Sequence, residues 1–211
     1  MRLLSLMFIC TSFSSWAQDS FNKSEVFEAK EIYFYGCNFD FVELAEPRKF
    51  EEPHRAAVYG WENFFMMKKS PYILADRMSK KKFHFRTTNS AARISNIDPD
   101  SVITFFKEVT PNETLLKEVK GLNIDETDGL GLILFVDYFE TRKEESLVHY
   151  VFFDIRSREV LWLESLITHA MGGGRIVSEW GYALDHNFNY FIDKLYYPQN
   201  KKHTRKTRKN G

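Results

Sequence analysis

The sequence is poor in cysteine: 211 residues include only two, Cys10 and Cys37. Cys10 lies in an N-terminal segment that we expect to be removed, which leaves Cys37 alone. One cysteine cannot form an internal disulfide, so the core must be held together by side-chain packing. Aromatic residues make up 16% of the chain. At this length they provide enough apolar surface for one globular domain.

The sequence also lacks an apolar run long enough to cross a bilayer. A short, mainly apolar segment follows Arg2 near the N-terminus, and the small residues Ser15 and Ala17 occupy the −3 and −1 positions of a signal-peptidase cut after Ala17. We therefore predict a signal peptide at residues 1–17 and a soluble protein that is exported to the periplasm or secreted. The bulky Ile9 before Cys10 argues against a lipid-attachment cysteine.

There is no net charge, but this balance hides an acidic body and a basic tail. The last eleven residues, KKHTRKTRKNG, contain no acid. We predict that residues 198–211 are a disordered, solvated tail. The alternative is a tail that binds an anionic surface, such as lipid head groups, lipopolysaccharide or nucleic acid. Its basic residues are Lys201, Lys202, Arg205, Lys206, Arg208 and Lys209.

Familiar catalytic and metal-binding motifs are missing as well. The sequence has no GxSxG elbow and no HExxH or similar histidine spacing, so we expect no metal and no cofactor. The glycines Gly172, Gly173 and Gly174 are followed by Arg175 instead of the Lys and Ser or Thr of a phosphate loop. We interpret this segment as a strand-to-helix corner, with anion binding at these four residues as the weaker alternative.

Two carboxylates lie in or at the end of apolar strands, where a charge is costly unless it is paired. These are Asp137 and Asp154, and on adjacent strands they would be a weak candidate for an acid–base pair. The simpler interpretation is that Asp154 begins a turn and that Asp137 pairs with a base or points to water. His149 alternates with apolar residues, which indicates a core or cross-strand histidine.

What the sequence does contain is a clear pattern of strands and helices. The segments GLGLILFVDYFE, SLVHYVFFDI and EVLWLESLI predict three strands, and their short links require antiparallel neighbours. The first is apolar on both faces and should be covered on both sides. A long amphipathic helix is predicted from about residue 175. We predict an α+β fold with a mainly antiparallel sheet and helices packed on it, comprising a lead at residues 18–30 and a single domain at residues 31–197.

Several segments together resemble uncharacterised exported proteins of bacterial envelopes. They are EIYFYGCNFDFVEL, YVFFDIRSREVLWLES and AMGGGRIVSEWGYAL, which correspond to a first strand, a hairpin, and a glycine-rich turn before a closing helix. The pattern also looks like the fold of small periplasmic accessory lipoproteins. The resemblance implies a compartment and a fold, and none of its motifs is catalytic.

The sequence therefore favours a non-enzymatic binding or accessory module of the cell envelope, with an envelope protein as its partner. The alternative is an exported hydrolase or small-ligand-binding protein that uses Asp137 and Asp154. A third hypothesis gives the function to the basic tail.

Overall fold

The computed structural model describes residues 22–45, 54–87, 90, 97–98, 101–104, 107–140, 142–169 and 176–210. The predicted signal peptide lies outside these residues. The strands are β1 (Glu31–Asn38), β2 (Glu43–Ala45), β3 (Lys82–Phe85), β4 (Ile103–Thr104), β5 (Leu130–Glu140), β6 (Glu145–Asp154) and β7 (Val160–His169). The helices are α1 (Lys23–Glu28), α2 (His54–Met67), α3 (Pro71–Arg77), α5 (Asn112–Gly121), α6 (Ile176–Tyr190), the π-helix η2 (Phe191–Tyr196) and α7 (Tyr197–Asn210).

The seven strands form one sheet, and five of them are parallel to one another. β3 pairs with β1, β1 and β2 each pair with β5, and β4 pairs with β2. The predicted antiparallel meander β5-β6-β7 is present and extends this sheet beyond β5. The fold is therefore α/β, and the prediction of a mainly antiparallel α+β sheet was wrong. Short links fix neighbours as antiparallel only within the meander. β1 and β5 are joined through a long segment that carries helices, and a connection of this kind permits parallel pairing.

The strands β1 and β2 lie end to end along the same edge of β5. β1 pairs with the first half of β5, and β2 pairs with its last residues. The register of β1 shifts around Gly36, whose φ of +84° belongs to the left-handed region. A Cβ at this position would lie 2.6 Å from Oε1 of Glu62, so the bend requires glycine for both its conformation and its space.

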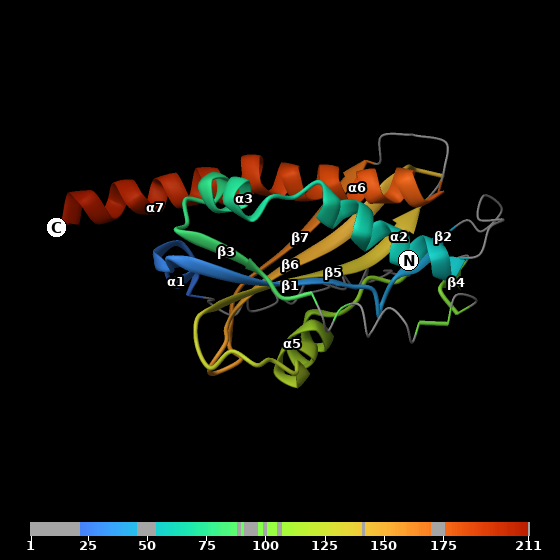
Figure 1. The fold of residues 1–211 in the computed structure, drawn as a ribbon, viewed down its shortest axis with the longest axis horizontal. Helices are drawn as coiled ribbons and strands as arrows, with labels where there is room; N and C mark the ends of the chain where they lie inside the picture. Colours follow the sequence, from blue (N-terminus) through green and yellow to red (C-terminus); the bar gives the residue numbers. More distant parts are fainter. Residues whose placement is uncertain are drawn as a thin grey trace, which may run out of the picture.

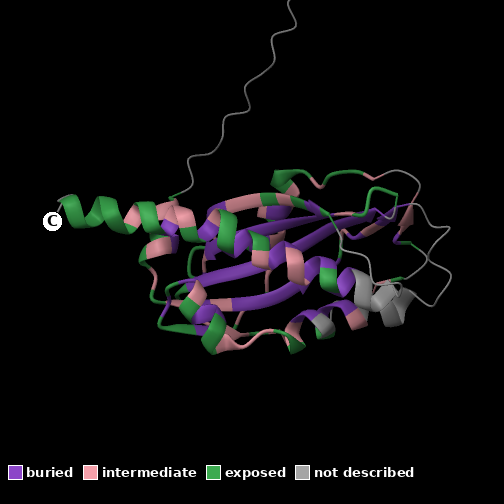
Figure 2. Ribbon diagram, turned by 90° about the horizontal axis from the view of Figure 1, so that it is seen from above, coloured by how far each residue is buried: buried purple, intermediate pink, exposed green. Residues whose placement is uncertain are grey.

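Both faces of the sheet are covered (Figure 1). The helices α2, α3 and α6 lie on one face, over the larger apolar core, and α5 lies on the other over a smaller core. Every residue of β5 is buried, as Figure 2 shows for the central strands. This confirms the prediction that β5 is covered on both sides, and it explains why its sequence is apolar without alternation.

The C-terminal helix is longer than predicted. α6, η2 and α7 follow one another without a break from Ile176 to Asn210. Trp180, Leu184 and Phe188 are buried against the sheet, as the spacing predicted. The segment predicted to be a disordered tail forms α7, which extends beyond the body of the molecule in Figure 1. The predicted N-terminal lead includes α1, which packs against β7 and α7.

Candidate functional site

Asp137 lies at a β-bulge in β5. Val136 pairs with Val148 and Tyr138 pairs with Leu147, so Asp137 has no residue directly opposite it on β6. Its side chain is 1% exposed. The carboxylate accepts hydrogen bonds from the backbone N–H and the hydroxyl of Thr110, which precedes α5. The bulge therefore directs a buried carboxylate to donors that lie outside the sheet.

His149 links Asp137 to the edge of the sheet. Its Nε2 lies 3.5 Å from Oδ2 of Asp137, and its Nδ1 lies 2.7 Å from Oγ of Ser165 on β7. Ser165 is opposite His149 in the β6–β7 register and is exposed, whereas the His149 side chain is 1% exposed. Three polar side chains from adjacent strands thus form a row from the buried β5 to the exposed Ser165 on β7. We call Asp137, His149 and Ser165 the polar row.

A second charged group lies next to the polar row at the same end of β5. Nζ of Lys107 is 2.6 Å from a Glu140 oxygen and 3.1 Å from a Glu145 oxygen, and it lies 4.2 Å from the centre of the Tyr138 ring. Burial lowers the pKa of Lys107, but its hydrogen bonds to Glu140, Tyr138 and Glu145 outweigh burial and raise that pKa above its ordinary value. Lys107 is therefore a fixed cation whose partners are carboxylates of β5 and β6.

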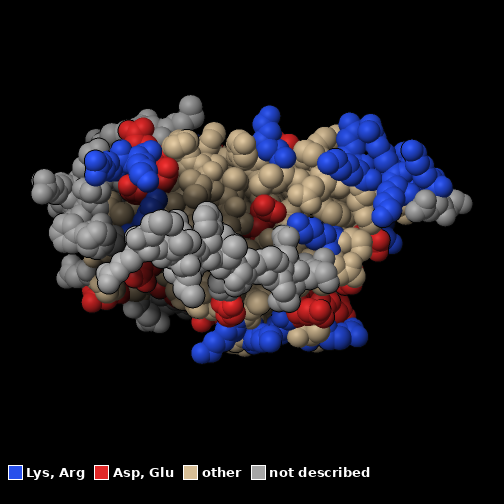
Figure 3. All heavy atoms as spheres, turned by 180° about the vertical axis from the view of Figure 1, so that it is seen from behind, with Lys and Arg blue, Asp and Glu red and all other residues tan. Residues whose placement is uncertain are grey.

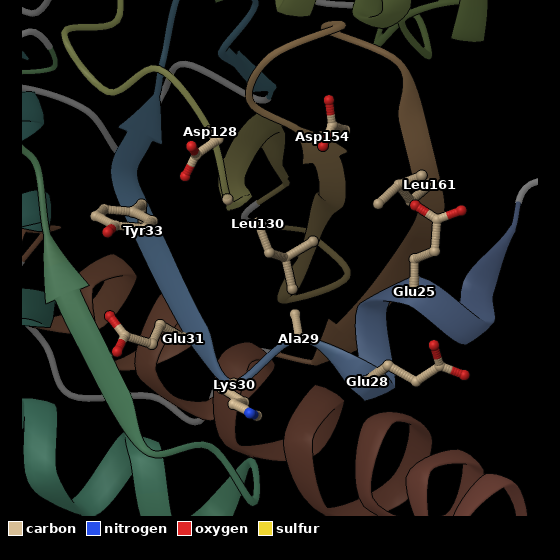
Figure 4. A pocket seen from close by; sticks show the side chains of 11 residues that line it. Glu25, Glu28, Ala29, Lys30, Glu31, Tyr33, Asp128, Leu130, Asp154 and Leu161 are labelled. Atoms are coloured by element: carbon tan, nitrogen blue, oxygen red, sulfur yellow. The ribbon is translucent and has the colours of Figure 1, made fainter. Parts of the chain in front are cut away.

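An acidic pocket of about 510 Å³ lies at the opposite end of β5 (Figure 4). Its lining includes Asp154, which lies opposite Leu130 in the register. One oxygen of Asp154 accepts hydrogen bonds of 2.7 and 2.8 Å from the backbone and hydroxyl of Ser157. Asp154 therefore organises the turn that follows β6. Within the described residues, no three potential ligands are grouped to hold a metal ion. The other carboxylates that line the pocket are Glu25, Glu28, Glu31 and Asp128.

The structure does not bring Asp137 and Asp154 together. Asp154 pairs with the first residue of β5, and Asp137 is seven residues further along that strand. At about 3.3 Å per residue the two carboxylates are about 23 Å apart. They cannot exchange a proton directly. The other sequence candidate, Gly172, Gly173, Gly174 and Arg175, lies outside the described residues.

The basic residues of α7 form the third candidate. All six are exposed, and none forms an ion pair with any other residue that the structure describes. The opposite side of α7 faces α1: Nε2 of His203 lies 3.3 Å from a Glu28 oxygen, and its ring lies 5.6 Å from that of Phe27. These contacts hold one side of α7 against the body. Figure 3 shows the resulting group of Lys and Arg side chains at one end of the molecule.

Ser165 was missed by the sequence analysis, which considered Asp137 and His149 separately. The cross-strand interpretation of His149 is confirmed by its contacts with β5 and β7. The available signal was the spacing of polar residues along three strands joined by short links. Two bulges, between Val136 and Tyr138 and between Phe152 and Phe153, hide it because each shifts the register by one residue.

No protein-family model matches the sequence, and no curated protein matches it. Among solved structures, the chain is similar to the lipoprotein GNA1162 from Neisseria meningitidis, with 12% sequence identity and a TM-score of 0.30. The match covers 79% of this chain and 99% of that chain. A likeness this loose does not establish a common fold. None of the described helices is both long and apolar enough to traverse a bilayer.

Proposed function

We propose that the protein is an exported accessory module of a bacterial envelope that attaches to anionic lipid through α7. The observation that supports this proposal is the position of the cations on the helix. At 3.6 residues per turn, the six basic positions fall within an arc of about 160°. The opposite side carries His203, Thr204 and Thr207. The folded helix therefore presents a single cationic face, which the sequence analysis had assigned to a disordered tail.

The body of the protein helps to present this face. His203 contacts Glu28 and Phe27, so the side opposite the cations is the one that packs on α1. The basic side chains lie on the side of α7 opposite these contacts and form no ion pair with any other residue that the structure describes. A helix fixed in this way can bring its cations to a surface together, without first becoming ordered.

A lipid surface suits this face better than a groove of nucleic acid does. The cations are spread over a broad arc, and Tyr197 at the start of α7 is 48% exposed. Exposed tyrosines at the edge of a basic segment are typical of membrane interfaces. Each Lys or Arg near an anionic bilayer contributes about 1 kcal/mol, so six cations suffice for reversible attachment. The helix lacks the apolar face that would be needed to insert.

The test is binding to vesicles of phosphatidylglycerol and phosphatidylcholine, using the chain from Gln18 onward, which includes every described residue. Replacing four cations of α7 with glutamine should weaken binding by at least about 100-fold. Raising NaCl to about 1 M shortens the screening length to about 3 Å and should release the protein. The four replaced residues are Lys202, Arg205, Lys206 and Lys209.

A matched control removes the same charge from the other side of the molecule. It replaces Lys117 and Lys120 on α5, and Arg142 and Lys143 after β5, which are all exposed. We expect this variant to bind vesicles within a few-fold of the unchanged protein. Equal losses in the two variants would show that net charge alone drives attachment and would overturn the proposal. Tighter binding to duplex DNA than to the vesicles, lost in the α7 variant, would assign the face to nucleic acid instead.

A further inference from the structure

We propose that the polar row is a nucleophilic centre that hydrolyses small carboxylic esters, with Ser165 as nucleophile, His149 as general base and Asp137 as the residue that positions the imidazole. The inference concerns the sheet and does not depend on α7. It assigns hydrolysis to a different set of residues from the Asp137 and Asp154 pair suggested by the sequence. The observation that supports it is that the imidazole ring of His149 contacts both Asp137 and Ser165.

The protonation of His149 follows from its surroundings. Its Nε2 is buried, makes no regular hydrogen bond, and lies 3.5 Å from a carboxylate oxygen of Asp137. A lone pair on Nε2 would face that anion and be repelled by it. The proton therefore lies on Nε2, and Nδ1 carries the lone pair of the neutral ring. That lone pair lies 2.7 Å from Oγ of Ser165 and accepts its hydroxyl proton.

Asp137 is held independently of His149. The N–H and the hydroxyl of Thr110 both donate to its carboxylate, so the carboxylate is fixed before it interacts with the imidazole. The distance from Asp137 to His149 is long for a hydrogen bond, but contacts of this kind often shorten only when substrate is bound. A buried carboxylate, an imidazole and an exposed hydroxyl in this order have the same connectivity as the catalytic triads of hydrolases. The two ring nitrogens have exchanged roles here.

The chemistry follows from this arrangement. Oγ of Ser165 attacks the carbonyl carbon of an ester while its proton passes to Nδ1 of His149, and the carbonyl electron pair moves to oxygen. When the tetrahedral species collapses, the alcohol departs and takes the proton from His149. Water then attacks the acyl-serine with His149 again acting as base, and releases the acid and Ser165. The net reaction consumes one ester and one water and yields one acid and one alcohol.

The position of Ser165 limits the substrate. Ser165 is exposed on β7, which pairs only with β6 among the described strands. The acidic pocket lies at the other end of the sheet and does not surround Ser165. Alternate backbone N–H groups of an edge strand point away from the sheet, and we expect those of β7 beside Ser165 to donate to the developing oxyanion. We therefore expect the site to act on small esters with good leaving groups.

The first experiment uses a fluorophosphonate, which transfers its phosphonyl group to the oxygen of an activated serine with loss of fluoride. We expect a covalent adduct on Ser165, located by peptide mass spectrometry, and turnover of p-nitrophenyl acetate by the chain from Gln18 onward. Ser165→Ala should abolish both the adduct and the turnover. His149→Gln should slow labelling by at least about 100-fold, the usual contribution of a general base.

A second serine provides the control. Ser157 is exposed and donates its hydroxyl to the Asp154 carboxylate, with no histidine in that pair. Ser157→Ala should leave the labelling of Ser165 unchanged, and Ser157 should not be labelled. Asp137→Asn should slow labelling and displace its pH profile, which a purely structural role would not do. No adduct on Ser165, or labelling of Ser165 no faster than that of Ser157, would overturn the proposal. Unchanged circular dichroism of Ser165→Ala will show that any loss is not due to unfolding.

Discussion

Oδ1 of Asn187 accepts a hydrogen bond of 2.8 Å from the hydroxyl of Tyr150, and neither residue is exposed. The amide nitrogen of Asn187 donates to the carbonyl oxygen of Leu166 at 3.1 Å. One side chain of α6 therefore satisfies polar groups of both β6 and β7. These hydrogen bonds fix the position of the helix along the meander, which apolar contacts alone would not do because they are not directional.

We predict that Asn187→Leu lowers the free energy of unfolding by about 2–5 kcal/mol, because it leaves the buried hydroxyl of Tyr150 without its acceptor and the partly buried carbonyl oxygen of Leu166 without this donor. Urea denaturation followed by circular dichroism measures this loss. The double variant with Tyr150→Phe should be less destabilised than the sum of the single changes, since the unpaired hydroxyl is then absent. A loss below about 1 kcal/mol for Asn187→Leu would show that water replaces the amide.

The bend in β1 gives a second prediction. Gly36→Ala should destabilise the protein by more than about 1 kcal/mol, because alanine disfavours a positive φ and its Cβ would collide with Glu62. Gly121 in α5 is the matched control, since a Cβ there meets no atom within 4 Å. Gly121→Ala should be neutral or stabilising by up to about 1 kcal/mol. Thermal unfolding of the two variants separates the effects, and equal melting temperatures would contradict the prediction.

Glu62 should make stability depend on pH. Burial raises the pKa of Glu62, and hydrogen bonds from the Cys37 N–H and the Ser90 hydroxyl only partly offset this shift. The folded state therefore retains the proton more strongly than the unfolded state. Below the unfolded pKa, near 4.5, both states are protonated. As the pH rises through the folded pKa, the buried carboxyl ionises at a cost and stability is lost.

Glu62→Gln removes this ionisation and keeps an oxygen that can accept the Cys37 N–H. We expect the variant to gain in melting temperature relative to the unchanged protein between pH 4 and pH 7, with the difference increasing as the pH rises. The comparison is made by calorimetry at several pH values. A difference that is constant or that shrinks toward pH 7 would show that folding does not raise the pKa of Glu62.

The part of the fold that the sequence predicts is the part with local signals. Short links define β5, β6 and β7, and the apolar run of β5 indicates cover on both faces. The sequence contains no such signal for the pairing of the parallel strands. β1 and β5 are almost a hundred residues apart, and β2 and β4 contain only three and two residues. Their positions are set by packing against β5, which no local pattern records.

The polar row shows the same limit within a single motif. Phe153 lies opposite Val160 in the β6–β7 pairing. If the register continued from this pair without a bulge, Glu164 would lie opposite His149. The bulge between Phe152 and Phe153 moves Ser165 into that position. A one-residue shift exchanges the two faces of a strand, so the candidate nucleophile depends on a bulge and not on any residue pattern.

The last prediction concerns Lys80, which connects α1 to the rest of the molecule. Its Nζ donates to the carbonyl oxygens of Val26, Phe27 and Ala29 at 2.6, 3.1 and 2.7 Å. A charged donor at the end of a helix satisfies carbonyls that the helix itself leaves free. Lys80→Met should lower the free energy of unfolding by about 2–4 kcal/mol. Lys81→Met, at an exposed neighbour, should change it by less than about 0.5 kcal/mol.

Lys80→Met should also destabilise α7, because Glu28 and Phe27 of α1 contact His203 on the inner side of that helix. Hydrogen exchange should therefore increase in Lys23–Glu28 and at the start of Tyr197–Asn210 in Lys80→Met, but not in Lys81→Met. Faster exchange in α1 alone would show that α7 is positioned by η2 and not by Glu28 and Phe27. In that case the cationic face would depend on the continuity of the C-terminal helix, and the vesicle affinity of Lys80→Met would equal that of the unchanged protein.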